Sequence, residues 1–170
     1  MKQKNTARKV AVYGMLIALA FIFSYVEAIV PIPIPVPGVK LGLANLVTIT
    51  GLYLIGIPGT IAVSLVRILL VGLTFGNTFS MLYGLAGGSL SLLLMAIARK
   101  WDLLDQTGVS ILGGAGHNIG QLIVAAFVVQ TAGVFAYLPV LLIAGTIAGG
   151  LIGLLGGLVT ARIEGFVRRS

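Results

Sequence analysis

Apolar residues fill most of this chain in long stretches, separated by short polar or proline-rich segments. Several stretches are long enough for helices that cross a hydrocarbon core of ~30 Å at ~1.5 Å per residue. A Gly-Ile-Pro-Gly turn at residues 56–59 separates two of them. The pattern predicts an all-α membrane protein, a six-transmembrane-helix bundle with helices over about residues 10–30, 41–57, 59–75, 77–98, 107–130 and 137–160.

Composition supports this prediction. Apolar residues make up 58% of the chain and charged residues only 9%, and the mean hydropathy is +1.13. Soluble domains carry about 25% charged residues, so a water-facing surface cannot be assembled here. The length of 170 residues suits one integral membrane domain, residues 1–170, with no soluble catalytic or nucleotide-binding domain. Cysteine is absent, which excludes disulfides and cysteine-based metal sites.

The net charge of +7 comes from basic residues that are unevenly distributed. Nine of the eleven Lys and Arg residues lie in the first nine residues, in the loop after residue 98 or in the C-terminal tail. The positive-inside rule then places both termini in the cytoplasm of a multi-pass protein in the bacterial cell membrane. The expected partner of this charge is therefore membrane lipid, not nucleic acid.

A basic start followed by an apolar run is also how a signal peptide begins. The run at residues 10–30 is longer than the usual apolar region of such a peptide, however. The sequence Tyr25-Val26-Glu27 is also unlike a cleavage site with small residues. We therefore expect the first helix to be retained.

Polar residues interrupt the apolar stretches at a few positions. Asn45 lies in the second predicted helix and Arg67 at the centre of the third. An arginine at this depth costs at least ~2.5–3.5 kcal/mol, so it normally faces the protein interior or a polar cavity. In the fifth predicted helix, His117, Asn118 and Gln121 share one broad face at a similar depth. These groups either hydrogen-bond to one another across helices or line a path for a ligand or ion.

A second polar group is expected near the outer face of the membrane. Glu27 and Lys40 either lie at the headgroup level, where they can pair, or form the rim of an outward-opening cavity together with Asn77. The proline-rich segment 31–38 is extended, and it either caps the mouth of that cavity or is a stiff connector. Because Glu27 is the only nearby acid, an anionic or polar-aromatic solute is favoured over a cation.

Small residues follow two helix faces. Ala11, Gly14 and Ala18 share one face of the first helix, which predicts either a packing seam within the bundle or a docking face for another membrane subunit. The last helix carries a ladder of glycines at intervals of four. Its members are Gly145, Gly149, Gly153 and Gly157. Both patterns favour close approach of helices.

Catalytic patterns are missing from the sequence. A polyprenyl synthase needs clustered aspartates to hold Mg²⁺ and diphosphate. Only Asp102 and Asp105 lie together here, beside Arg99 and Lys100, which is typical of a solvated charge cluster. The chain also contains neither a phosphate-binding loop nor an HExxH sequence. We expect no catalytic residues, no metal site and no cofactor.

Four segments carry a family resemblance. They are KLGLANLVTI (40–49), GIPGT (56–60), LVRILLVGLTFGN (65–77) and SILGGAGHNIGQLIVA (110–125). With them the chain resembles the Gx transporter family, also labelled heptaprenyl diphosphate synthase component I, and is similar to the S components of energy-coupling factor transporters. The resemblance implies an S-component-like six-helix bundle that captures a micronutrient-like solute from outside. A coupling subunit and two ATPase subunits would drive its uptake, with Ala11, Gly14 and Ala18 docking on the coupling subunit.

Three functional hypotheses follow. In the first, the chain is such a transport component, and its substrate-binding residues are Asn45, Arg67, Asn77, His117, Asn118 and Gln121. In the second, it is a non-catalytic membrane subunit associated with polyprenyl diphosphate or quinone metabolism, or with a membrane redox complex. In the third, it is a solitary proton-coupled carrier that uses His117 as its titrating group.

Overall fold

The computed structural model describes residues 2–30 and 42–169, with side chains for 7–30 and 42–164, and this part of the chain is helical apart from its turns. The proline-rich segment 31–38 and Lys40 lie outside the described residues. The elements are α1 (Lys2–Ile29), α2 (Leu43–Leu54), α3 (Gly56–Thr74), α4 (Thr78–Lys100), α5 (Gln106–Val129), the 3₁₀ helix η1 (Ala132–Tyr137) and α6 (Leu138–Arg169).

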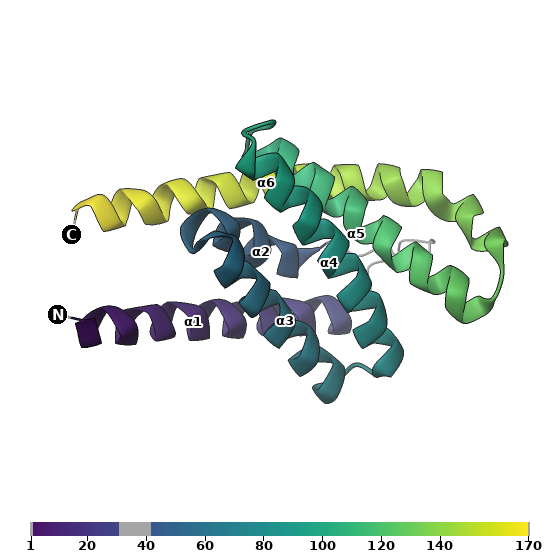
Figure 1. Ribbon diagram of the computed structural model, residues 1–170, viewed down its shortest axis with the longest axis horizontal. Helices are drawn as coiled ribbons and strands as arrows, with labels where there is room; N and C mark the ends of the chain where they lie inside the picture. The colour runs from purple at the N-terminus through teal and green to yellow at the C-terminus, as the bar shows by residue number, and fades with distance from the viewer. Residues whose placement is uncertain (1, 31–41, 170) are drawn as a thin grey trace.

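The helices pack as two groups of three. In one group, α5 lies between α4 and α6 along most of its length, and in the other α1 contacts both α2 and α3. Contacts of α3 with α4 and of α2 with α6 join the two groups. α1 begins and α6 ends at the same side of the bundle (Figure 1). A buried apolar cluster of Ile49, Leu52, Met95, Val109 and Ile152 holds α2 against α4, α5 and α6.

α2 is shorter than the sequence pattern predicted. The expected helix over residues 41–57 has only 12 residues, about 18 Å at ~1.5 Å per residue. Gly42 and Gly56 bound it with φ angles of 77° and 78°, a conformation that glycine adopts without strain. The predicted turn at 56–59 is also wrong. The break lies at Ile55 and Gly56, and Pro58 belongs to the first turn of α3, where a missing amide hydrogen costs nothing.

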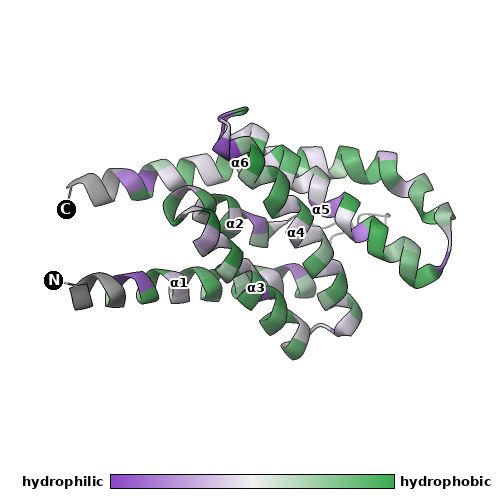
Figure 2. Ribbon diagram, viewed as in Figure 1, coloured by the Kyte–Doolittle hydropathy of each residue, from purple (hydrophilic) through white to green (hydrophobic). Residues whose placement is uncertain are grey.

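Five helices are long and apolar enough to cross a membrane, and α2 is the shorter sixth helix of the described chain. Figure 2 shows apolar residues over most of the helix surfaces, with hydrophilic residues next to the grey ends of α1 and α6, in the connection between α4 and α5, and on α5. α1 and α6 are longer than expected, with 28 and 32 residues, because each helix continues through its basic end. The chain is thus a multi-pass helical protein of the membrane type.

Glycines let α5 approach both of its neighbours closely. A Cβ atom built at Gly120 would lie 2.6 Å from the carbonyl oxygen of Ala86 in α4. On the other side, one built at Gly149 would lie 2.8 Å from the carbonyl oxygen of Ser110. The predicted glycine ladder of the last helix is therefore an internal packing seam at Gly145, Gly149 and Gly153, whereas Gly157 has open space around it.

Arg99 links the end of α4 to the end of α2. Its Nη1 donates a hydrogen bond to the carbonyl oxygen of Leu52, and its guanidinium lies 4.8 Å from the ring centroid of Tyr53. Carbonyl groups in the last turn of a helix have no partner within the helix, so Arg99 satisfies one of them. This contact fixes the short helix α2 at the end of the bundle where α4 meets α5.

Arg99→Met is expected to lower the free energy of unfolding by about 1–3 kcal/mol, because it removes a charge-assisted hydrogen bond and a cation–π contact. Thermal unfolding in detergent measures this change. Lys100→Met, at the exposed neighbouring position, is the matched control and should change stability little. Equal destabilisation by the two variants would contradict the proposed role of Arg99.

Candidate functional site: a cavity between the helices

A large cavity of about 630 Å³ lies between the helices in the described part of the chain. All six α-helices contribute to its wall. Glu27, Gly42, Phe75 and Asn77 lie on the wall at the end of the bundle where α1 and α3 end and α2 and α4 begin. Met95 and Ile152, from the apolar cluster around α2, line its opposite end. The cavity therefore runs inward from one end of the bundle and is closed at the other by apolar side chains.

All six residues proposed from the sequence as substrate-binding lie on the wall of this cavity. They are Asn45, Arg67, Asn77, His117, Asn118 and Gln121. They come from α2, α3, the start of α4 and α5, so the fold brings together positions that lie up to 76 residues apart in the sequence. The void between them means that these side chains do not simply fill the space with one another.

Arg67 carries the only formal positive charge on the described cavity wall. Its Nη1 lies 3.5 Å from Oγ of Ser24 in α1, a long hydrogen bond. Its Nε is shielded from solvent and makes no hydrogen bond within the described residues. A buried donor of this kind costs free energy unless something pairs with it.

Asn45 and Gln121 carry amide groups that remain available. Neither side chain makes a hydrogen bond within the described residues, although both line the cavity. Asn45 is in the first turn of α2, and Gln121 is in α5, close to Gly87 of α4. Two neutral hydrogen-bonding groups thus face the void from different helices.

Asn118 and Asn77 line the cavity and also make hydrogen bonds that stabilise the fold. The Nδ2 of Asn118 donates a 2.7 Å hydrogen bond to the carbonyl oxygen of Leu141, which ties α5 to α6. The side chain of Asn77 accepts from the backbone N–H of Ser80, and Ser80 Oγ accepts in return from the Asn77 N–H. Asn77 therefore caps α4 in a reciprocal arrangement that the asparagine and serine three positions apart could have indicated.

His117 lies on the cavity wall at one of the close contacts between α5 and α4. A Cβ atom at Gly87 would lie 2.8 Å from the His117 carbonyl oxygen and 3.0 Å from its ring. Gly87 thus leaves space for the imidazole between the two helices. Substitution of Gly87 by a larger residue would displace His117 or separate the helices.

Glu27 lies on the cavity wall near its outer end. This position agrees with the sequence-based interpretation that placed Glu27 at the rim of a cavity. Its Oε1 accepts a 2.5 Å hydrogen bond from the backbone N–H of Gly42, the residue that precedes α2. The carboxylate is thereby fixed at the positive N-terminal end of a helix. Pairing of Glu27 with Lys40 is not described, because Lys40 lies outside the described residues.

Several polar wall residues were not proposed from the sequence. They are Ser24, Tyr83, Ser91 and Ser110. Serines are common in apolar helices as packing residues, so their sequence positions carried little signal. Only Ser24 could have been proposed as a wall residue from the sequence, because it lies three residues before Glu27 and therefore on the same face of α1.

Ala11, Gly14 and Ala18 lie on an exposed face of α1, away from the cavity. A Cβ atom at Gly14 would meet nothing within 4 Å. The interpretation of these residues as a packing seam within the bundle is therefore wrong. They form a stripe of small residues on the outer surface of the described structure.

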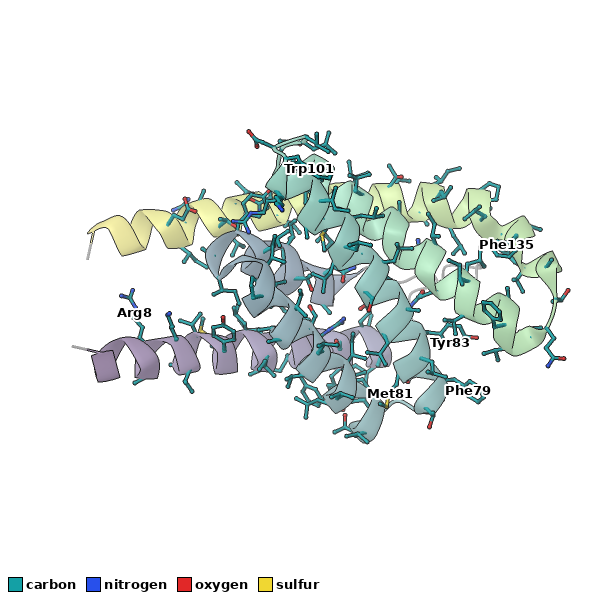
Figure 3. All side chains as sticks on the ribbon, in the orientation of Figure 1. Arg8, Phe79, Met81, Tyr83, Trp101 and Phe135 are labelled. Carbon is teal, nitrogen blue, oxygen red and sulfur yellow. The ribbon has the colours of Figure 1, made fainter. Side chains whose placement is uncertain are left out.

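The two neighbouring aspartates lie in the connection between α4 and α5 and are not part of the cavity wall. Asp105 is the N-cap of α5 and accepts a 2.8 Å hydrogen bond from the N–H of Gly108. Asp102 is exposed and has a positive φ of 50°. Trp101 stands exposed in the same connection (Figure 3). Asp105 therefore has a local structural role in this turn.

Comparison with known proteins identifies a family. A family model described as heptaprenyl diphosphate synthase component I matches residues 16–159, which contain all six helices in whole or in part and all six proposed wall residues. No curated protein and no solved structure matches the chain.

Proposed function

The chain belongs to the heptaprenyl diphosphate synthase component I family, and from this premise we propose that it is the solute-binding membrane component of an energy-coupling factor transporter. In this role it has no catalytic activity of its own. It takes up a small micronutrient-like solute from outside the cell, and partner subunits supply the energy. It lies in the bacterial cell membrane with both termini in the cytoplasm.

The cavity is the observation that carries this proposal. Its volume of about 630 Å³ lies within the range of pockets that bind small molecules. Its wall combines apolar surface with a few convergent polar groups, among them Arg67, Asn45 and Gln121. Ionisable groups within a membrane are expensive and generally functional, and here the guanidinium borders an open space.

The exposed stripe of Ala11, Gly14 and Ala18 supports docking on a membrane coupling subunit. A stripe of small residues allows another helix to approach closely in lipid, where packing drives association. The described chain has no closely packed helix on this face. In the proposed assembly the coupling subunit covers the stripe, and two ATPase subunits bind that subunit.

Uptake by proteoliposomes tests the proposal. The chain is co-expressed with an energy-coupling module from the same cell, and small molecules that copurify are identified by mass spectrometry and then offered as labelled solutes. Uptake should require ATP and should fall by ~2–10-fold in Gln121→Ala, because the loss of a hydrogen bond from a neutral side chain costs ~0.5–1.5 kcal/mol. Ser89→Ala, an exposed position on α4, is the control.

Uptake that survives ATP depletion but collapses with the proton gradient would replace this proposal by the solitary carrier that uses His117. Undiminished uptake by Gln121→Ala would remove that residue from the binding site.

A second candidate function rests on the family description, which names a component of a synthase. The chain would then be a non-catalytic membrane subunit that holds a prenyl diphosphate enzyme, or a quinone-linked redox complex, at the bilayer. Purification of the tagged chain from membranes distinguishes the two. Recovery of a soluble synthase or redox protein, without ATPases, would favour this second function.

A further inference from the structure

We infer that the solute carries an oxyanion, a carboxylate or a phosphate, and that this group binds Arg67 within the cavity. The inference rests on the proposed function, because it names the class of solute for the same cavity. It is argued from the charges and hydrogen bonds of the wall residues.

Arg67 lacks a direct counterion. No carboxylate of the described residues forms an ion pair with its guanidinium, and its Nη1 donates a hydrogen bond to the neutral hydroxyl of Ser24 at 3.5 Å. Nε is shielded from solvent and unpaired within the same residues. Arginine presents its donors in a planar fork that matches carboxylate and phosphate oxygens. An oxyanion beside Arg67 would therefore supply both the missing charge and the missing acceptors.

Glu27 attracts Arg67 electrostatically, but within the described residues it forms no ion pair with the guanidinium. It is the only acidic residue on the described wall, and its Oε1 is held by the Gly42 backbone N–H at 2.5 Å. This bond fixes the carboxylate at the start of α2. Ser24, one turn earlier on α1, is the neighbour that contacts Arg67 instead. One carboxylate oxygen of the nearest acid is thus bound at a helix end, and Arg67 has no acidic group in direct contact among the described residues.

The opposite wall is polar and carries no Asp, Glu, Lys or Arg side chain among the described residues, and His117 is the titratable imidazole on it. α4 and α5 contribute Ser91, Ser110 and Gln121 to the cavity, and Asn118 is bonded to the Leu141 carbonyl. Formal charge on the described wall is therefore confined to α1 and α3. This asymmetry favours a solute with its anionic group toward Arg67 and a neutral, hydrogen-bonding part toward α5.

The test uses small aromatic probes that share a phenyl ring and differ in the charge and type of their polar group. Benzoate, phenyl phosphate and the neutral isostere benzamide are added to the purified full-length protein at ~10 mM, which suits the weak affinity expected for molecules of this size. Ionic strength is matched with sodium chloride. We expect benzoate or phenyl phosphate to raise the midpoint of thermal unfolding by ~2–4 °C, and benzamide to have little effect. A larger shift with one anion than with the other identifies a carboxylate or a phosphate site.

Arg67→Gln should abolish the shift caused by the anions, and Arg67→Lys should retain part of it. Arg162→Gln, which removes the same charge at an exposed position on α6, should leave the shift unchanged. Equal stabilisation by benzamide and the anions, or an anion shift that persists in Arg67→Gln, would overturn the inference. The transport proposal is tested separately, by ATP-dependent uptake. The anion assignment can therefore fail in the unfolding experiment while the transport proposal stands.

Discussion

Gly149→Ala is expected to lower the free energy of unfolding by at least ~2 kcal/mol, the usual cost of forcing an extra group into a close-packed contact. The added Cβ would lie 2.8 Å from both the carbonyl oxygen of Ser110 and the Cα of Ile111. These are backbone atoms of α5, so no side chain can rotate away to relieve the contact. The two helices would have to separate along the seam that α6 shares with α5. Thermal unfolding in detergent should show a fall of ~4–8 °C.

Gly157→Ala is the matched control for this prediction. It lies two turns further along the same helix, and an added Cβ would meet nothing within 4 Å. Alanine favours helix over glycine by ~1 kcal/mol, so this variant should be neutral or slightly more stable. If Gly149→Ala were as stable as Gly157→Ala, the close packing of α5 and α6 would be wrong.

Arg67→Met is expected to abolish solute uptake while leaving the solute-free protein as stable as before, or more stable by ~1–4 kcal/mol. Replacement of a buried charge by an apolar side chain of similar length is often stabilising, because the charge no longer has to be desolvated. In the wild-type protein the Nε of Arg67 is buried and unpaired within the described residues. The increase in the free energy of unfolding of the variant would measure how much the buried Arg67 guanidinium destabilises the solute-free wild-type protein.

The loss of uptake follows from the same guanidinium. Removal of one partner from a buried, hydrogen-bonded charge pair costs ~2–5 kcal/mol, which corresponds to a fall in affinity of ~30-fold or more. Stability is followed by thermal unfolding and affinity by titration of the copurifying solute. Arg162→Met, exposed on α6, should change neither quantity. A large loss of stability in Arg67→Met without solute would mean that Arg67 is a structural residue.

The positions of the long helices could be predicted from the sequence with few errors. α4 and α5 begin and end within about two residues of their predicted limits. A long apolar stretch bounded by charged residues is expected to form a helix, because backbone N–H and C=O groups in lipid must find hydrogen-bond partners within the segment. The close packing of the glycine ladder of α6 was also predicted from the sequence, whereas the cap at Asn77 was not.

The errors had local causes. The length of α2 was overestimated, since Gly42 and Gly56 were counted as parts of apolar runs although their positive φ angles end the helix. α1 and α6 were predicted too short, because a helix continues into water as long as nothing in its sequence stops it. The stripe on α1 was left open between two interpretations, since small residues suit an internal and an external contact equally well.

The sequence by itself determined that the protein is a bundle of apolar helices with a few buried polar side chains, because periodicity and hydropathy are properties of each segment. Only the tertiary structure decided that Asn45, Arg67 and Gln121 border one cavity, while Asn118 is bonded to Leu141 and Glu27 to Gly42. Which polar group meets a partner and which meets an open space depends on how the helices cross, and close glycine contacts between α4, α5 and α6 set that crossing.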